Sequence, residues 1–194
     1  MRDLSNIKKS RQSGSDALFS LSSGYVTLEL KLGLKSTGRC AIAFKSVSGS
    51  MFYEMEQELR KFLDSVRPEF NINYNVITDS YGYMWVAFDG QRVEDLLPGV
   101  NAVADTVVER GFKDQLLAAV FEFQDERGGA SRYQYLIYNY KRNCFYPFVP
   151  TGADKRDSEA ELKIMSAAGE EDMPFEKDMS LWYPIWNLPL KTRG

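Results

Sequence analysis

The stretch YLIYNYKRNCFYPFVP, residues 135–150, carries six aromatic rings around one short basic turn. From Tyr133 to Tyr140 the side chains alternate between the two faces of a predicted β-strand. The residues KRN (141–143) then reverse the chain, and Phe145–Val149 is expected to return as a short partner strand. The prolines in and after this partner place it at the edge of a sheet, because proline has no N–H for a central ladder.

Both faces of this hairpin carry aromatic side chains: Tyr133 and Tyr135 share one face, and Tyr138 and Tyr140 share the other. Each ring buries about 150–250 Å², so leaving several in water is costly. If one face packs on helices, the other must lie beneath another element or stay open as an interaction surface. The C-terminal stretch LWYPIWNLPL (181–190) is the candidate cover, since its prolines forbid a regular helix. We expect it to lie extended across the sheet or a helix, and its alternative role is a docking strip for a partner.

Periodicity of apolar residues predicts the elements that precede and follow the hairpin. They are a short helix capped by Ser15 and Asp16 through Leu21, a segment over residues 25–34 read as helix rather than strand, a strand over Arg39–Val47, a helix over residues 52–66 that stops at Pro68, a hairpin of Asn73–Thr78 and Tyr83–Phe88, a helix over residues 93–108, a strand over Leu116–Phe123, and a helix over Asp154–Ala168. This order predicts an α+β fold, an antiparallel sheet with helices packed on one face. A ferredoxin-like or secretion-chaperone-like sandwich fits it, with an added C-terminal hairpin, helix and extended tail.

A chain of 194 residues suits one domain. We divide it into a basic flexible tail (1–15), a single α+β domain (16–175) and an extended aromatic C-terminal segment that packs on the domain (176–194). Residues 1–11 carry four basic side chains against one acidic one, about +3, whereas the rest of the chain carries about −6. The tail is expected to be frayed or to make a weak contact with anionic lipid or an acidic partner.

Composition excludes several classes of function. A net charge of −3 and a pI near 5.2 argue against nucleic-acid binding through a broad basic face. No apolar run approaches the roughly 20 residues that cross a bilayer, and the start has no apolar signal core, so we expect a cytoplasmic protein. Cys40 and Cys144 lie outside any CxxC pattern, which predicts buried free thiols rather than disulfides or a zinc site.

Catalytic motifs are scarce. The chain has no histidine, which excludes Ser-His-Asp and Cys-His catalysis and HExxH zinc sites. It also lacks the glycine-rich loops that cradle dinucleotides or nucleoside triphosphates, and no cofactor is predicted. Glu54 with Glu58, and Asp157 with Glu161, are spaced to share a divalent ion, yet solvated helix faces commonly show this spacing.

Two further motifs have competing interpretations. Asp79, in the turn DSYG, could line a polar pocket with Tyr81 and Tyr83, but aspartate is an ordinary turn former and this interpretation is favoured. In YKRNC, the neighbouring lysine and arginine could lower the pKa of the Cys144 thiol, although no general base accompanies it. The same Lys141 and Arg142, bordered by tyrosines, also suit recognition of an acidic protein surface.

The motifs SDALFSLSSGYVTLELKLGLKSTGRCAIAFKSV, ITDSYGYMWV, GFKDQLLAAVFEF, YLIYNYKRNCFYPFVP and WYPIWNLPL, taken in order, make the chain similar to the PspA-associated protein PspAB family over roughly residues 15–190. The basic start MRDLSNIKKSRQ departs from the short apolar segment with which family members tend to begin. The resemblance implies a phage-shock-like envelope stress module, beside a PspA-type coiled-coil protein, a PspAA-type companion and often a membrane metalloprotease. It implies no catalytic residues.

The resulting hypothesis is a non-enzymatic adaptor or regulatory protein that binds a protein partner through an aromatic sheet surface. It is placed in the cytoplasm or peripherally at the inner face of the membrane. The candidate partner-binding residues are Tyr138, Tyr140, Lys141, Arg142, Tyr146, Trp182, Tyr183 and Trp186. The alternatives are a metal-dependent or thiol-dependent enzyme and a homodimeric structural protein.

Overall fold

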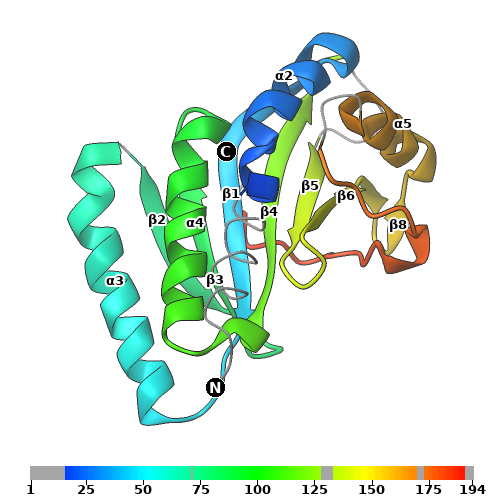
Figure 1. Cartoon of the computed structure of the whole chain (residues 1–194). Helices are drawn as coiled ribbons and strands as arrows, with labels where there is room; N and C mark the ends of the chain where they lie inside the picture. Colours follow the sequence, from blue (N-terminus) through cyan, green and yellow to red (C-terminus); the bar gives the residue numbers. More distant parts are fainter. Residues whose placement is uncertain (1–15, 71, 128–132, 170–172, 191–194) are drawn as a thin grey trace.

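A computed structural model describes residues 16–70, 72–127, 133–169 and 173–190 of the chain (Figure 1). Its centre is a six-stranded antiparallel sheet with the strand order β2-β3-β1-β4-β5-β6. The strands of this sheet are β1 (Leu34–Lys45), β2 (Asn73–Thr78), β3 (Tyr83–Asp89), β4 (Leu116–Asp125), β5 (Tyr133–Asn139) and β6 (Cys144–Phe148). The helices are α2 (Leu21–Leu32), α3 (Ser50–Phe70), α4 (Val93–Glu109) and α5 (Ser158–Ala168), and a two-stranded ladder joins β7 (Pro150–Gly152) to β8 (Lys155–Arg156).

The run β1-α3-β2-β3-α4-β4 forms the central unit. Its strands lie in the order β2-β3-β1-β4, so β1 and β2 flank β3 and the two helices cross on the same side. This is the βαββαβ connectivity of a ferredoxin-like unit. The hairpin of β5 and β6 extends it on the β4 side. The predicted α+β fold with an antiparallel sheet is therefore confirmed.

Alternation along each strand separates two cores. In β1, Cys40, Ile42 and Phe44 face the helices, whereas Ala41 and Ala43 face the opposite side. We call these sides the helix face and the second face. Residues 182–190 of the chain, drawn in red in Figure 1, cross the second face behind the sheet. The strand residues that they cover include Trp85, Val120, Ile137, Tyr146 and Phe148.

Most predicted elements are confirmed. Residues 25–32 are helical, β2 and β3 form a hairpin, and β6 is an edge strand. Side chains of β5 alternate as expected, with Leu136 and Tyr138 on the helix face and Ile137 on the second face. The basic tail, residues 1–15, lies outside the described residues.

Three boundaries differ from the prediction. The first strand begins at Leu34 rather than Arg39, because Gly33 ends α2 in the left-handed conformation (φ 67°) and a bulge lets the strand continue past residues 36–40. Helix α3 includes Pro68 and ends two residues later, at Phe70. The last helix begins at Ser158 rather than at residue 154.

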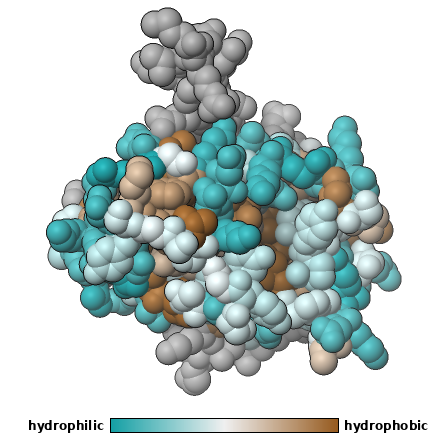
Figure 2. Space-filling model, turned by 90° about the horizontal axis from the view of Figure 1, so that it is seen from below, coloured by the Kyte–Doolittle hydropathy of each residue, from teal (hydrophilic) through white to brown (hydrophobic). Residues whose placement is uncertain are grey.

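Asp157 explains this late start. Its backbone is extended, and its carboxylate accepts a hydrogen bond from the Ala160 N–H at 3.0 Å, which caps α5. The residues just before it pair with β7 as strand β8. None of the described helices is long and apolar enough to cross a membrane. On the side shown in Figure 2, hydrophobic residues form separate patches between hydrophilic ones.

Candidate functional site

Residues 173–190, here called the C-terminal segment, first meet the sheet at the β6 edge. The Phe145 N–H donates to the Pro174 carbonyl at 2.7 Å, and the Glu176 N–H donates to the Phe145 carbonyl at 2.8 Å. These bonds form one parallel bridge between Phe145 and Phe175. Beyond this bridge the segment leaves the edge and crosses the second face.

Trp182 and Arg156 hold the segment in place. The buried Trp182 ring donates from Nε1 to the Glu176 carbonyl at 3.0 Å, and Arg156 Nη1 donates to the Trp182 carbonyl at 2.7 Å. Arg156 Nε also bonds both carboxylate oxygens of the buried Glu161 at 2.8 and 2.9 Å. Glu161 accepts the Val149 N–H at 2.9 Å, so one carboxylate ties α5 to β8 and to the end of β6.

Burial raises the pKa of the Glu161 carboxyl. The hydrogen bonds from Arg156 and the Val149 N–H oppose this effect, but the pKa stays above its ordinary value. Arg156, the cation that stabilises this carboxylate, also holds the C-terminal segment through the Trp182 carbonyl.

The basic turn between β5 and β6 is exposed, and its residues make contacts within the chain. The Asn139 side chain accepts the N–H groups of Lys141 and Arg142 at 3.0 and 3.3 Å, which shapes the turn. Arg142 forms an ion pair with Glu176 of the C-terminal segment. The hydrogen bond from Arg142, with the Asp178 N–H, lowers the pKa of Glu176. The chain's own carboxylate thus occupies the position predicted for an acidic partner.

Cys144 follows this turn and is buried, as is Cys40, and both thiols are free as predicted. Burial raises the pKa of Cys144, and Glu176, whose Oε2 lies 3.9 Å from Sγ, raises it further. Arg142 lowers this pKa, but not enough to offset burial. The neighbouring basic residues, which could have lowered the pKa of this thiol, therefore do not bring it below its ordinary value.

Three of the predicted partner-binding residues are buried, and a fourth, Tyr140, is partly buried. Tyr138 has no exposed surface and packs on the helix face, whereas Tyr146 and Trp182 are buried on the second face. The Tyr140 ring meets Tyr138 edge-on at 5.0 Å, and its hydroxyl is buried with no hydrogen-bond partner among the described residues. These rings fill the two cores, because both faces of the β5–β6 hairpin are covered by other parts of the chain.

The other four are at the surface. Lys141 and Arg142 are exposed, and the side chains of Tyr183 and Trp186 are 56% and 37% exposed. The Tyr183 carbonyl accepts the Tyr146 hydroxyl at 3.1 Å, and the Trp186 ring packs edge-on against Phe148 with its centre 5.1 Å away. Glu176 connects the groups, since it bonds both Arg142 and Trp182. We call Lys141, Arg142, Tyr183 and Trp186 the exposed strip.

Sequence reasoning missed a buried ion pair on the second face. Arg39 of β1 pairs with Glu122 of β4, and the Tyr135 hydroxyl donates to Glu122 Oε2 at 3.4 Å. The Arg39 guanidinium also lies 5.5 Å from the centre of the Tyr133 ring. Burial raises the pKa of Glu122, with Thr37 and Arg39 opposing it. The charge of Glu122 in the middle of the apolar run LLAAVFEF was the signal that could have found this pair.

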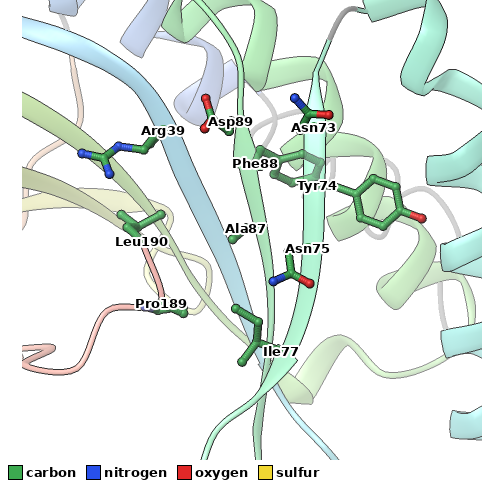
Figure 3. A pocket seen from close by; sticks show the side chains of 10 residues that line it. All are labelled: Arg39, Asn73, Tyr74, Asn75, Ile77, Ala87, Phe88, Asp89, Pro189 and Leu190. Atoms are coloured by element: carbon green, nitrogen blue, oxygen red, sulfur yellow. The ribbon is translucent and has the colours of Figure 1, made fainter. Parts of the chain in front are cut away.

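Next to this pair is a groove of about 160 Å³, between β2, β3 and the end of the C-terminal segment (Figure 3). Its polar lining includes Arg39, Asn73, Asn75 and Asp89, and its apolar lining includes Ile77, Ala87, Pro189 and Leu190. Figure 3 shows Asn75 and Ile77 on one side of β2 and Tyr74 on the other. A groove of this size has room for about one large side chain.

The other predicted polar groups have structural roles. Asp79 accepts the N–H groups of Tyr81 and Tyr83 at 2.9 and 3.0 Å and Trp85 Nε1 at 2.9 Å, so it shapes the β2–β3 turn, as favoured. Burial raises the pKa of Asp79, but these hydrogen bonds outweigh it and the pKa is lowered.

Three carboxylates of the two predicted pairs have other partners in the structure. Glu58 forms an ion pair with Arg110, and Asp157 and Glu161 are engaged as described above. Among the described residues, no three Cys, Asp or Glu side chains are grouped so that they could hold a metal ion.

The model of the family PspA associated protein B, or PspAB, matches residues 2–190. The chain belongs to the PspAB family. No curated protein and no solved structure matches it. The match spans nearly the whole chain, so the fold described above and the exposed strip are parts of a PspAB protein.

Proposed function

We propose that this PspAB protein is a non-enzymatic adaptor or regulatory protein of a PspA-type membrane stress response. The family name supports an association with PspA. The observation that carries the proposal is the exposure of Tyr183 and Trp186 on a segment that hydrogen bonds from Tyr146 and Arg156 hold against the domain. A segment held in this way presents aromatic side chains at little entropic cost, and Tyr and Trp are enriched among the residues that dominate binding energy.

The proposed contact surface is the exposed strip. Lys141 in the β5–β6 turn supplies an exposed cation on the same hairpin that the two rings pack against, which suits a partner with acidic side chains around an apolar contact. The proposed partner is the PspA-type coiled-coil protein, and a PspAA-type companion and a membrane metalloprotease are further members of the same proposed assembly. The proposed location is the cytoplasm, with peripheral recruitment to the inner face of the membrane through that partner.

The test measures binding of the full chain to a purified PspA-type protein from the same organism by isothermal titration calorimetry. The variant Tyr183→Ser with Lys141→Glu should weaken binding at least about tenfold, since both changes remove central contacts. The matched control is Tyr81→Ser with Lys61→Glu, because Tyr81 is 74% exposed and Lys61 is exposed elsewhere on the molecule. Equal binding by the two double variants would rule out the exposed strip.

The PspAA-type companion gives a second arm of the same experiment. Binding to the companion alone, lost in the Tyr183 and Lys141 variant, would keep the strip and change the partner. Absence of binding to either protein at concentrations up to about 100 μM would contradict the adaptor function itself, because even weak specific contacts have affinities of this order.

A further inference from the structure

The two edges of the main sheet are treated differently by the chain. The β6 edge contains Pro147 and is bridged by Phe175 of the C-terminal segment. The β2 edge, NYNVIT, has no proline and no charged residue, and its register with β3 runs from Asn73 to Thr78 without a bulge. Charges, prolines and bulges are the usual devices that stop an edge strand from pairing with another chain. Strand β2 has none of them.

The hydrogen bonds of the β2–β3 turn show which backbone groups of β2 point outward. The Asp79 N–H donates to the Tyr83 carbonyl at 2.9 Å, in line with the β2–β3 register. Antiparallel pairs alternate in hydrogen bonding, so Asn73, Asn75 and Ile77 direct their N–H and C=O groups to β3. The same groups of Tyr74, Val76 and Thr78 therefore point away from the sheet. In the part of the chain that the structure describes, no backbone group bonds to that side of β2.

We propose that the β2 edge is a self-association surface, on which β2 of a second copy of this chain pairs antiparallel. A two-fold axis at Val76 places Tyr74 opposite Thr78 of the second copy and Val76 opposite itself. In this register each outward N–H meets an outward C=O, because the three outward residues of one strand face the same three of the other. The two sheets then form one continuous sheet across the axis.

A second copy fits this edge because the surface is self-complementary. The strand carries no charge, so pairing with itself brings no like charges together. Helix α3 lies along the same edge: Tyr74 donates to Asp64 at 2.7 Å, and Arg67 donates to Asn73 at 2.8 Å. This flank of α3 carries both signs of charge, Arg60 and Arg67 with Asp64 between them. All three side chains already have partners within their own chain, namely Glu56, Asn73 and Tyr74.

Sedimentation velocity on the full chain over a range from about 1 to 300 μM tests this, since the monomer has a mass of 22.2 kDa. The wild-type chain should reach twice this mass within the range. Thr78→Lys adds a charge at the edge and should raise the dimer Kd at least about tenfold. Thr151→Lys is the matched control, because Thr151 is an exposed threonine on β7, and it should dimerise like the wild type.

Val76→Pro provides a second variant. It removes one outward N–H and leaves the bonds to β3 intact, which an edge strand tolerates. It should also dissociate the dimer, while circular dichroism stays like that of the wild type. If Val76→Pro fails to fold, Thr78→Lys decides alone.

Two results would overturn the proposal. One is a wild-type chain that stays monomeric over the whole concentration range. If Thr78→Lys then weakens binding to a PspA-type protein, β2 is a docking strand for that partner instead. The other is a dimer that Thr78→Lys and Thr151→Lys both leave unchanged. Because the exposed strip is a different surface, the Tyr183 and Lys141 variant should dimerise normally, so failure here leaves the adaptor proposal standing.

Discussion

The helix face and the second face of the sheet both bury apolar and aromatic side chains, but helices cover the first and an extended segment covers the second. On the helix face, amphipathic helices such as α4 contribute buried residues at every turn, including Leu96, Val100 and Val107. On the second face, the C-terminal segment contributes Trp182 and a few half-buried side chains, and its only helical part is one short turn, Met179–Leu181.

This difference affects how each cover is held. A helix satisfies its own backbone hydrogen bonds, so it needs only an apolar stripe to dock. An extended segment cannot do this and depends on external partners, here Arg156, Tyr146 and the β6 edge. We therefore expect the helix face to unfold with the whole domain, and the second face to be able to open locally.

The comparison is tested most strongly by removing one large ring from each face. Phe88 lies on the helix face and is 1% exposed, so Phe88→Ala should lower the global free energy of unfolding by about 3–5 kcal/mol. Trp182→Ala should cost less, about 2 kcal/mol, because the loss cannot exceed the free energy that docks the segment. Urea unfolding measures both, and hydrogen exchange should accelerate only in residues 173–190 of the Trp182 variant. Equal global losses with no local exchange would show that the two covers are one cooperative unit.

Arg156→Met sharpens the comparison by breaking the polar anchor of the second cover. It leaves the Glu161 carboxylate buried without its cation, which should cost about 3 kcal/mol. Adding Glu161→Leu should recover part of this loss, since the uncompensated charge is then gone. Lys163→Met on the same helix is the control, because its ion pair with Glu159 is exposed, and it should leave the unfolding midpoint in urea unchanged. A neutral Arg156→Met would mean that packing alone holds the segment.

The fold could be predicted from local signals, and the site only in part. Hydrophobic periodicity and the turn residues around Asp79 predicted the helices and the β2–β3 hairpin, because these patterns depend on near neighbours. Aromatic content and prolines predicted that residues 181–190 would be extended. The role of each ring could not be read in this way: Tyr138 and Tyr183 differ only in what packs over them, and that is set by distant residues.

The charged contacts were beyond the sequence for the same reason. Arg39 and Glu122 are 83 positions apart in the chain, and only the pairing of β1 with β4 brings them together. Arg142 was predicted to recognise a carboxylate of a partner, and this stays a prediction. Its ion pair with Glu176 could not be predicted, because no local pattern encodes how the C-terminal segment crosses the β6 edge.

A smaller effect is expected at Asp79, which shapes the β2–β3 turn and bonds Trp85 on the second face. Its pKa is lowered in the folded chain, so its contribution to stability is present above its unfolded pKa and is lost as the pH falls through the folded pKa. Asp79→Asn should lower stability by about 1 kcal/mol near neutral pH and by less at pH 3. Thermal melts of both proteins at the two pH values measure this. If the difference in stability between the two proteins were larger at pH 3 than at neutral pH, the direction of the Asp79 pKa shift would be wrong.

The smallest effect is a rate, and it separates the adaptor from the thiol-enzyme alternative. Burial raises the pKa of both thiols, more for Cys40 than for Cys144. Because the thiolate is the reactive form, iodoacetamide at pH 8 should modify both slowly in the folded chain, Cys40 more slowly, and both rapidly in urea. Arg142→Ala removes the one cation that lowers the Cys144 pKa, so it should not accelerate modification unless the turn opens. Fast alkylation of Cys144 in the native protein that Arg142→Ala slows would mean that the basic turn activates the thiol. It would favour the thiol-dependent enzyme, with its reactive group at the β6 edge, where the C-terminal segment begins.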